Sequence, residues 1–108
     1  MDRFEISTLR SYYGSLLTEK QNEMLRLHYD EDISFGELSE MYKISRQAVL
    51  DSIKRGEKAL EEMEKALKLR EHSENINVLI NKAQNALDTK DLAQVQEILN
   101  SLKSIMEE

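Results

Sequence analysis

The stretch ISFGELSEMYKISRQAVLDSIKR, residues 33–55, decides the fold because it carries two helix starts a short distance apart. Ser34 and Glu37 have the spacing of a capping box, in which the two side chains satisfy free backbone N–H groups at a helix N-terminus. Ser45, eleven residues after Ser34, is suited to capping a second helix. Eleven residues leave room for about two helical turns and a sharp bend. The stretch therefore predicts a helix-turn-helix unit.

The first helix of this unit is expected to begin at Phe35, to end near Tyr42, and to brace the second. Ser39 is the small residue expected where the two helices cross. Lys43 stands in the turn, where a left-handed backbone favours glycine and costs lysine about 1 kcal/mol. The inner faces are expected to be apolar, and two of the pairs, Ile33 with Leu38 and Ile44 with Val49, have the spacing of hydrophobic staples: Leu38, Tyr42, Ile44, Val49 and Ile53.

Two further helices are predicted ahead of this unit. Apolar residues recur at three- and four-residue steps over residues 4–17, and the expected buried face is Ile6, Leu9, Tyr13 and Leu16. Thr18 is expected to cap a second helix with Met24, Leu27 and His28 facing inward. That helix should end around residues 29–32, where three carboxylates oppose the helix dipole. We interpret these carboxylates as part of a solvated loop.

The helix that starts after Ser45 is expected to continue well past the motif. Its apolar seam alternates steps of four and three residues: Val49, Ile53, Gly56, Leu60, Met63 and Leu67. Gly56 on this seam indicates either the close approach of a neighbouring helix or a bend. The seam also admits a homodimer through the long helix; the alternative is that it covers the C-terminal segment.

A helical hairpin is predicted for the C-terminal part. We expect Ser73 to cap its first helix, after a break over residues 71–74, and residues 88–91 to form a turn. The expected apolar faces are Ile76, Ile80, Ala83 and Leu87 in one helix, and Leu92, Val95, Leu99, Leu102 and Met106 in the other, widened by Ile98 and Ile105. The predicted architecture is therefore all-α, with a helix-turn-helix domain over residues 1–70 and a C-terminal helical hairpin over residues 71–108.

Composition narrows the class of protein. The chain has 108 residues, no cysteine and no proline, which suits long helices and excludes disulfides. Its longest strictly aliphatic run is far too short to cross a bilayer, so we expect a cytoplasmic protein with no membrane span. No phosphate-cradling glycine loop or nucleophile–base pair is recognisable. We therefore expect no enzyme and no cofactor, and the two histidines lack companion metal ligands.

Outward-facing residues of the second motif helix are the candidate nucleic-acid contacts, because this helix enters the DNA groove in helix-turn-helix proteins. Arginine and glutamine can contact base edges, and lysine and arginine suit phosphates. Residues 42–58 hold five basic residues against two acidic ones, whereas residues 19–40 hold seven acidic against two basic. A net charge of −6 further predicts weak binding of DNA or RNA by a monomer. The candidates are Lys43, Arg46, Gln47, Leu50, Lys54, Arg55 and Lys58.

The segments YGSLLTEKQ (residues 13–21), ISRQAV (44–49) and IKR (53–55) resemble the YlxM family of small bacterial helix-turn-helix proteins. The resemblance covers roughly residues 6–70 and implies a fold similar to region 4 of bacterial sigma factors. It also implies a regulatory or accessory role in the signal recognition particle pathway of protein export, with components of that particle as partners. The sigma-like recognition surface then falls on Arg46, Gln47, Leu50, Lys54 and Arg55.

Two functions stay open at this point. One is a regulator or accessory protein of the export pathway that binds nucleic acid weakly, or contacts a protein or ribonucleoprotein. The other is a sequence-specific DNA-binding transcription regulator. Leu50 is apolar where base reading favours a polar or aromatic side chain, which suits protein contact equally well.

Overall fold

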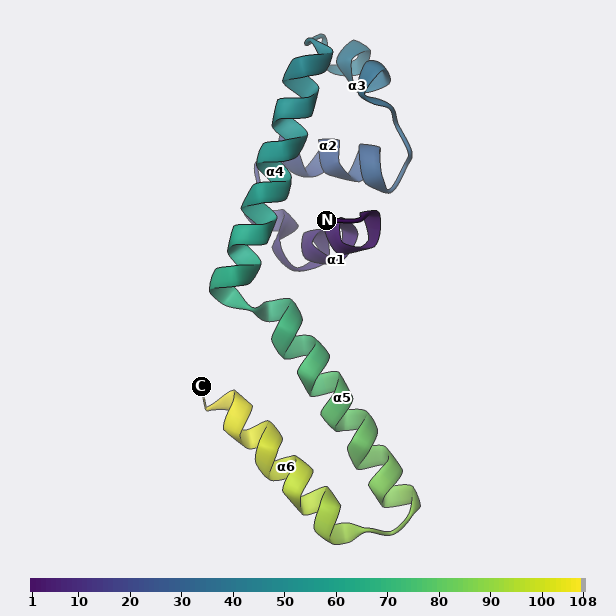
Figure 1. Cartoon of the computed structure of the whole chain (residues 1–108), viewed down its shortest axis with the longest axis vertical. Coiled ribbons are helices and arrows are strands. Elements are labelled where there is room, and N and C mark those ends of the chain that lie inside the picture. The colour runs from purple at the N-terminus through teal and green to yellow at the C-terminus, as the bar shows by residue number, and fades with distance from the viewer. Residues whose placement is uncertain (108) are drawn as a thin grey trace. The chain divides into compact units, whose positions relative to one another are not determined.

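The computed structural model describes residues 1–107, which form two compact units divided between Lys68 and Leu69. Six α-helices and one short 3-10 helix, and no strand, occur in this described part of the chain (Figure 1). The all-α fold is therefore as the sequence predicted, and the division falls two residues before the expected domain boundary. The elements are α1 (Arg3–Tyr13), η1 (Gly14–Leu16), α2 (Glu19–Tyr29), α3 (Phe35–Tyr42), α4 (Arg46–Leu67), α5 (Leu69–Asp88) and α6 (Leu92–Met106).

The first unit is built around α4, which packs against α1, α2 and α3 (Figure 1). Its core is one continuous cluster of buried side chains, and the staple residues Ile33 and Ile44 pack against its edge. The hydroxyl of Tyr13 donates to Glu64 Oε1 at 2.5 Å and ties the end of α1 to the C-terminal part of α4. The buried cluster comprises Ile6, Leu9, Tyr13, Met24, Leu25, Leu38, Val49, Ile53 and Leu60.

The close approach predicted at Gly56 is confirmed. Gly56 is buried, and a Cβ at this position would lie only 2.9 Å from Leu25 Cδ1 on α2. Leu25 itself is fully buried, whereas the sequence predicted Leu27 and His28 as inward-facing and overlooked it. Leu27 and His28 are only partly buried, because the face that α2 presents to Gly56 is centred on Met24 and Leu25.

The first helix is shorter than predicted. It ends at Tyr13 and gives way to the 3-10 turn η1, which places Leu16 at the surface with 61% of its area exposed. The tighter turn breaks the α-helical period, so the apolar spacing that includes Leu16 does not continue the buried face. A Cβ on Gly14 would lie 2.9 Å from Asn22 Oδ1, so this turn packs directly against α2.

The predicted break near residues 71–74 is wrong. α4 ends instead at Lys68, which adopts a left-handed backbone with φ 55° and whose N–H donates to Glu64 O at 2.8 Å. The next helix begins at once with Leu69, so Ser73 lies inside α5 and caps nothing. A serine caps a helix only where its own backbone is not helical, and here the break between the two helices falls five residues earlier, at Lys68.

The second unit is the predicted hairpin, in which α5 and α6 lie antiparallel and side by side (Figure 1). Its turn is confirmed at residues 88–91, with Lys90 left-handed at φ 59° and Asp91 capping α6 through Gln94 N at 3.1 Å. The predicted faces are partly wrong, since the buried residues are Ala86 and Ile98. Five of the residues predicted to pack inward are exposed: Ile80, Leu87, Leu92, Leu99 and Met106. None of the helices among residues 1–107 combines the length and the apolar character that crossing a bilayer requires.

Candidate nucleic-acid interface

The two helices of the motif, α3 and α4, each begin at a capping serine. Ser34 Oγ accepts from Glu37 N at 3.1 Å while Glu37 Oε1 accepts from Ser34 N at 3.3 Å, so the predicted capping box is complete. Ser45 caps α4 by accepting from Ala48 N at 3.0 Å. Both helix starts are therefore fixed by residues identified from the sequence.

Ser39 does more than provide a small side chain at the helix crossing. Its hydroxyl donates to Ile44 O at 2.5 Å, and its carbonyl accepts from Ile44 N at 3.2 Å. Between them Lys43 adopts the predicted left-handed backbone, with φ 56° and ψ 44°. This double contact joins α3 to Ile44, the residue that precedes the α4 cap Ser45. It therefore sets the angle between α3 and α4.

The predicted contact residues do not all share one side of α4. Residues four apart lie about 40° apart around a helix, so Arg46, Leu50 and Lys54 form a line along the N-terminal half of α4. Arg55 is about 180° around the axis from Arg46. Lys58 lies roughly 18 Å further along α4 than Arg46. The structure thus brings Arg46, Gln47, Leu50 and Lys54 together and leaves Arg55 and Lys58 apart.

An apolar hollow of about 280 Å³ lies beside this line of residues, lined by Phe35, Arg46, Gln47 and Leu50. Phe35 is the first residue of α3, and its ring is stacked on His28 with centroids 4.3 Å apart. His28 Nδ1 lies 2.8 Å from Ile33 O and donates to it, which fixes the imidazole and with it Phe35. Sequence reasoning missed Phe35 as a site residue. The signal available was an aromatic side chain at the first position of a short helix, and in the structure this side chain is only partly buried.

Several of the candidate side chains are free to contact a ligand. Within residues 1–107 the exposed side chains of Arg46, Lys54 and Arg55 make no hydrogen bond or ion pair. Gln47 is engaged, since its Nε2 donates to Asp51 Oδ1 at 2.9 Å. Base reading by Gln47 would therefore have to break an existing bond.

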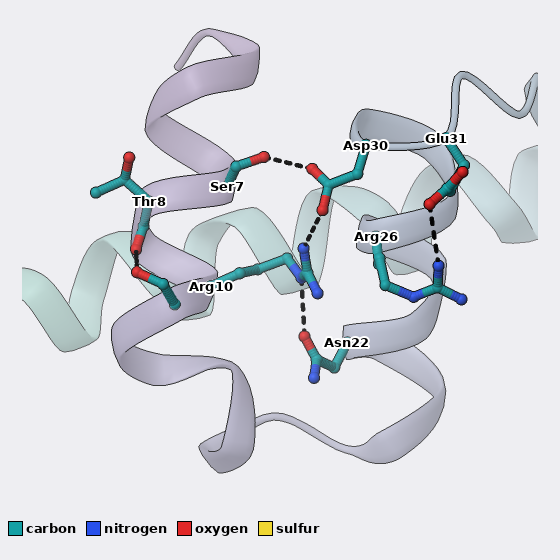
Figure 2. A network of polar contacts seen from close by, with 8 residues as sticks. Ser7, Thr8, Arg10, Asn22, Arg26, Asp30 and Glu31 are labelled. Atoms are coloured by element: carbon teal, nitrogen blue, oxygen red, sulfur yellow. Dashed lines mark hydrogen bonds and ion pairs between the residues drawn. The ribbon is translucent and has the colours of Figure 1, made fainter.

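Acidic residues near the motif are largely paired. Asp30 accepts from Arg10 Nη1 at 2.7 Å and from the Ser7 hydroxyl, and Glu31 lies 3.5 Å from Arg26 Nη1 (Figure 2). Asp32 forms an ion pair with the guanidinium of Arg3. The carboxylates at the end of α2 are exposed, as expected of a solvated loop, and each is in addition paired with an arginine.

This network links α1 to α2 and lowers the local negative charge. Arg10 also donates through Nε to Asn22 Oδ1 at 2.9 Å, so one guanidinium holds both ends of α2 against α1 (Figure 2). The hydroxyl of Ser7 holds the pKa of Asp30 below its usual value, with Arg10 acting in the same direction and burial opposing both. The excess of acid over residues 19–40 is therefore partly offset by two arginines of α1, which the sequence-based count did not include.

Comparisons with known proteins all relate the chain to one family of helix-turn-helix proteins. The family described as "Putative helix-turn-helix protein, YlxM / p13 like" (UPF0122) matches residues 1–102. A UPF0122 protein of Desulforamulus reducens is 39% identical over 106 residues, covering 94% of this chain and 87% of the relative. One from Limosilactobacillus reuteri is 38% identical over 107 residues, covering 97% and 95%. One from Clostridium perfringens is 53% identical over 68 residues, a match spanning 63% of this chain and 61% of the length of that relative.

Proposed function

Since the chain belongs to the UPF0122 family of helix-turn-helix proteins, we propose that it is a non-enzymatic regulatory or accessory protein that binds nucleic acid through the N-terminal half of α4. The observation that carries this proposal is the line formed by Arg46, Leu50 and Lys54. Both cations are exposed and uncommitted within the described residues, and they flank an apolar side chain beside the hollow at Phe35. This combination suits phosphate contact at the edges and an apolar contact at the centre.

The rigidity of the site supports the same role. Serine caps, the contact between Ser39 and Ile44, and the buried face of α4 hold the helix in one orientation. A recognition helix held in this way loses little conformational freedom when it binds. The pairing of Asp30, Glu31 and Asp32 with arginines reduces the repulsion that a polyanion would otherwise meet near α3.

The resemblance to the YlxM family extends the proposal to the signal recognition particle pathway, with the RNA or protein components of that particle as partners. In this role the apolar hollow at Phe35 and Leu50 would receive an unstacked base or an apolar side chain. Neither role requires a catalytic group in the chain.

Fluorescence anisotropy with a labelled RNA hairpin and a labelled DNA duplex, each titrated at several salt concentrations, tests the proposal. We expect binding to weaken steeply with salt, because phosphate contacts release counterions. The double variant Arg46→Ala/Lys54→Ala should bind at least about tenfold more weakly and reduce the salt slope by about two. Retained affinity in this variant would refute the proposed surface.

A matched control separates local contact from overall charge. Lys65→Ala/Lys82→Ala removes the same two charges from exposed positions outside the motif, and we expect its affinity to change less than about threefold. An equal loss in both variants would mean that binding depends on net charge alone. Preference for RNA over the duplex would favour the export pathway.

A transcription regulator is the second candidate, and Arg46 favours it because an arginine at the start of a recognition helix can contact guanine with two hydrogen bonds. Selection of duplexes from a random pool decides the question. An enriched sequence whose binding is lost on Arg46→Ala would support transcription regulation, and a pool that stays random would count against it.

A further inference from the structure

The hairpin of α5 and α6 is too thin to form a closed core by itself. Among its described residues only Ala86 and Ile98 are buried. A unit of about 40 residues usually needs disulfides, metals or association to be stable, and the chain has no cysteine. The apolar side chains that remain exposed therefore point to a missing partner.

A heptad repeat describes how these side chains are arranged. α5 and α6 pack against each other, and their buried and half-buried apolar residues are spaced three and four apart: Ile76, Leu79, Ala83 and Ala86 in α5, and Val95, Ile98, Leu102 and Ile105 in α6. The residue that follows the second member of each pair is apolar as well, and Leu92 continues this row one heptad earlier in α6. These five side chains are 41% to 80% exposed: Ile80, Leu87, Leu92, Leu99 and Met106. Three apolar positions in seven are typical of helices inside a bundle, whereas two in seven suffice for a two-helix seam.

The five exposed side chains lie on one face of the hairpin. In a right-handed helix each lies on the same side of its own contact line, about 60° to 100° around the axis from the middle of that line. Because α5 and α6 run antiparallel (Figure 1), the same rotational offset points to the same side of the pair. We call this set the hairpin face: Ile80, Leu87, Leu92, Leu99 and Met106.

Charge distinguishes the hairpin face from its surroundings. The positions that border it are Asn77, Gln84, Gln96 and Lys103, so the face and these border positions together carry a single charge. The opposite side of the hairpin carries Lys82 and Glu97. Depletion of charge at the centre with polar residues at the rim is the composition of a protein interface. One lysine is too little for a nucleic-acid partner, which would require several phosphate contacts.

We propose that the hairpin face binds the hairpin face of a second copy, forming a two-fold symmetric four-helix bundle. A nearly uncharged face can meet its own copy without bringing like charges together, although the whole chain has a net charge of −6. The seven-residue spacing of the exposed side chains keeps them in a straight stripe, as the small crossing angles of four-helix bundles require.

The first unit offers no apolar stripe of matching length. Its large exposed apolar side chains are scattered over separate elements, with Phe4 in α1, Leu16 in η1 and Met41 in α3. Along the seam of α4, Met63 packs against the core of residues 1–68, which leaves Leu67 as its large exposed apolar residue. The hairpin face is thus a better surface for self-association than the α4 seam.

The dimensions of the hairpin suit a dimer of modest affinity. The 15 residues of α6 rise about 22 Å, and two adjacent helices are about 20 Å wide. A face of this size has a footprint of about 450 Å² per copy, which in a pair approaches the roughly 1,000 Å² expected of a specific interface. We therefore expect a dissociation constant in the micromolar range.

Light scattering coupled to size exclusion, and sedimentation equilibrium of the full chain across the micromolar range, test the dimer. The wild type should approach twice its monomer mass of 12.6 kDa as concentration rises. Leu99→Glu should raise the dissociation constant at least about 100-fold, because each copy would bury an unpaired carboxylate. Ser104→Glu, which adds the same charge to α6 on the side away from the hairpin face, should dimerise like the wild type.

A second variant guards against a folding defect. Leu92 is the first residue of α6 and is 69% exposed, so Leu92→Glu should keep the helix, since acidic residues are favourable in a first turn. Circular dichroism should match the wild type while the mass stays that of a monomer. A wild type that is monomeric throughout, or variants that dimerise normally, would overturn the proposal. If the wild type is monomeric, protection of the hairpin-face residues from hydrogen exchange would show that another part of the same chain covers this face.

Discussion

Replacement of Gly56 by alanine gives a quantitative test of how closely α2 and α4 approach. An ideal Cβ at this position lies 2.9 Å from Leu25 Cδ1 and 3.4 Å from Leu25 Cγ. Leu25 is fully buried in the core of residues 1–68, where side chains are close-packed and have little room to move. The added methyl group therefore has to displace a core leucine.

Two effects of opposite sign set the expected magnitude. Alanine is about 1 kcal/mol more favourable than glycine inside a helix. Overpacking of a core typically costs about 1 to 3 kcal/mol. We expect a net loss of about 1 kcal/mol in the free energy of unfolding of Gly56→Ala, with a fall in the melting temperature of roughly 4 to 8 °C.

Urea denaturation followed by circular dichroism measures this loss, and Gly36→Ala is the matched control. A Cβ at Gly36 would meet its nearest atoms, Ser34 Oγ and Arg46 Nε, at 3.9 and 4.0 Å. Without overpacking, the helix preference alone should stabilise this variant by up to about 1 kcal/mol. The same substitution should therefore change stability in opposite directions at the two sites.

A double-mutant cycle identifies the contact responsible. Leu25→Ala alone should cost about 2 to 5 kcal/mol, and the Gly36→Ala background can offset part of that loss. With Leu25 truncated, Gly56→Ala should become stabilising by about 1 kcal/mol, because the methyl group then fills part of a cavity. An equal loss with and without Leu25 would refute the reasoning, since the cause could not be this contact.

Three further predictions concern local structure in the first unit. Lys43→Gly should stabilise the chain by about 1 kcal/mol in urea denaturation, because Lys43 holds a left-handed backbone that glycine adopts without strain; no gain would mean that its side chain compensates. Ser45→Ala should lower the free energy of unfolding by about 1 kcal/mol through loss of the α4 cap, and an unchanged urea midpoint would contradict that role. The pKa of Asp30 is lowered, chiefly by Ser7, so its contribution is present above its unfolded pKa of about 3.9 and is lost as pH falls through the lower folded pKa. Urea midpoints measured from neutral to acid pH should fall less steeply for Asp30→Asn, which should also be roughly 0.5 to 1 kcal/mol less stable at neutral pH; parallel curves would refute this contribution.

Local chemistry accounts for what the sequence predicted well. Ser34 and Ser45 cap helices because each satisfies an amide three residues away, and that interaction depends only on neighbouring residues. Lys43 was identified for the same reason, since a turn between two such caps needs a left-handed residue. Ser73 shows the limit of this reasoning. It has the right chemistry for a cap, but the break between α4 and α5 falls at Lys68, a residue with no turn signal of its own.

Contacts between distant residues account for what the sequence did not predict. The positions of Arg46, Leu50 and Lys54 on α4 follow from helical period alone. The hollow at Phe35 does not, because it depends on the stacking of Phe35 on His28. The buried face of the hairpin was predicted wrongly for the same reason. Its heptad repeat contains two adjacent rows of apolar residues, and only the packing of α5 on α6 determines which row is buried.

Self-association would affect nucleic-acid binding, because a dimer carries two copies of the recognition helix α4 and a monomer carries one. A single α4 presents two uncommitted cations in line, Arg46 and Lys54, and a chain of net charge −6 binds a polyanion weakly with so few phosphate contacts. Pairing of two hairpin faces would give each particle two such helices. The second binding event would then be intramolecular, which raises the overall affinity without any new type of contact. An acidic protein with a sparse recognition surface can therefore act on nucleic acid as a dimer where the monomer alone would not.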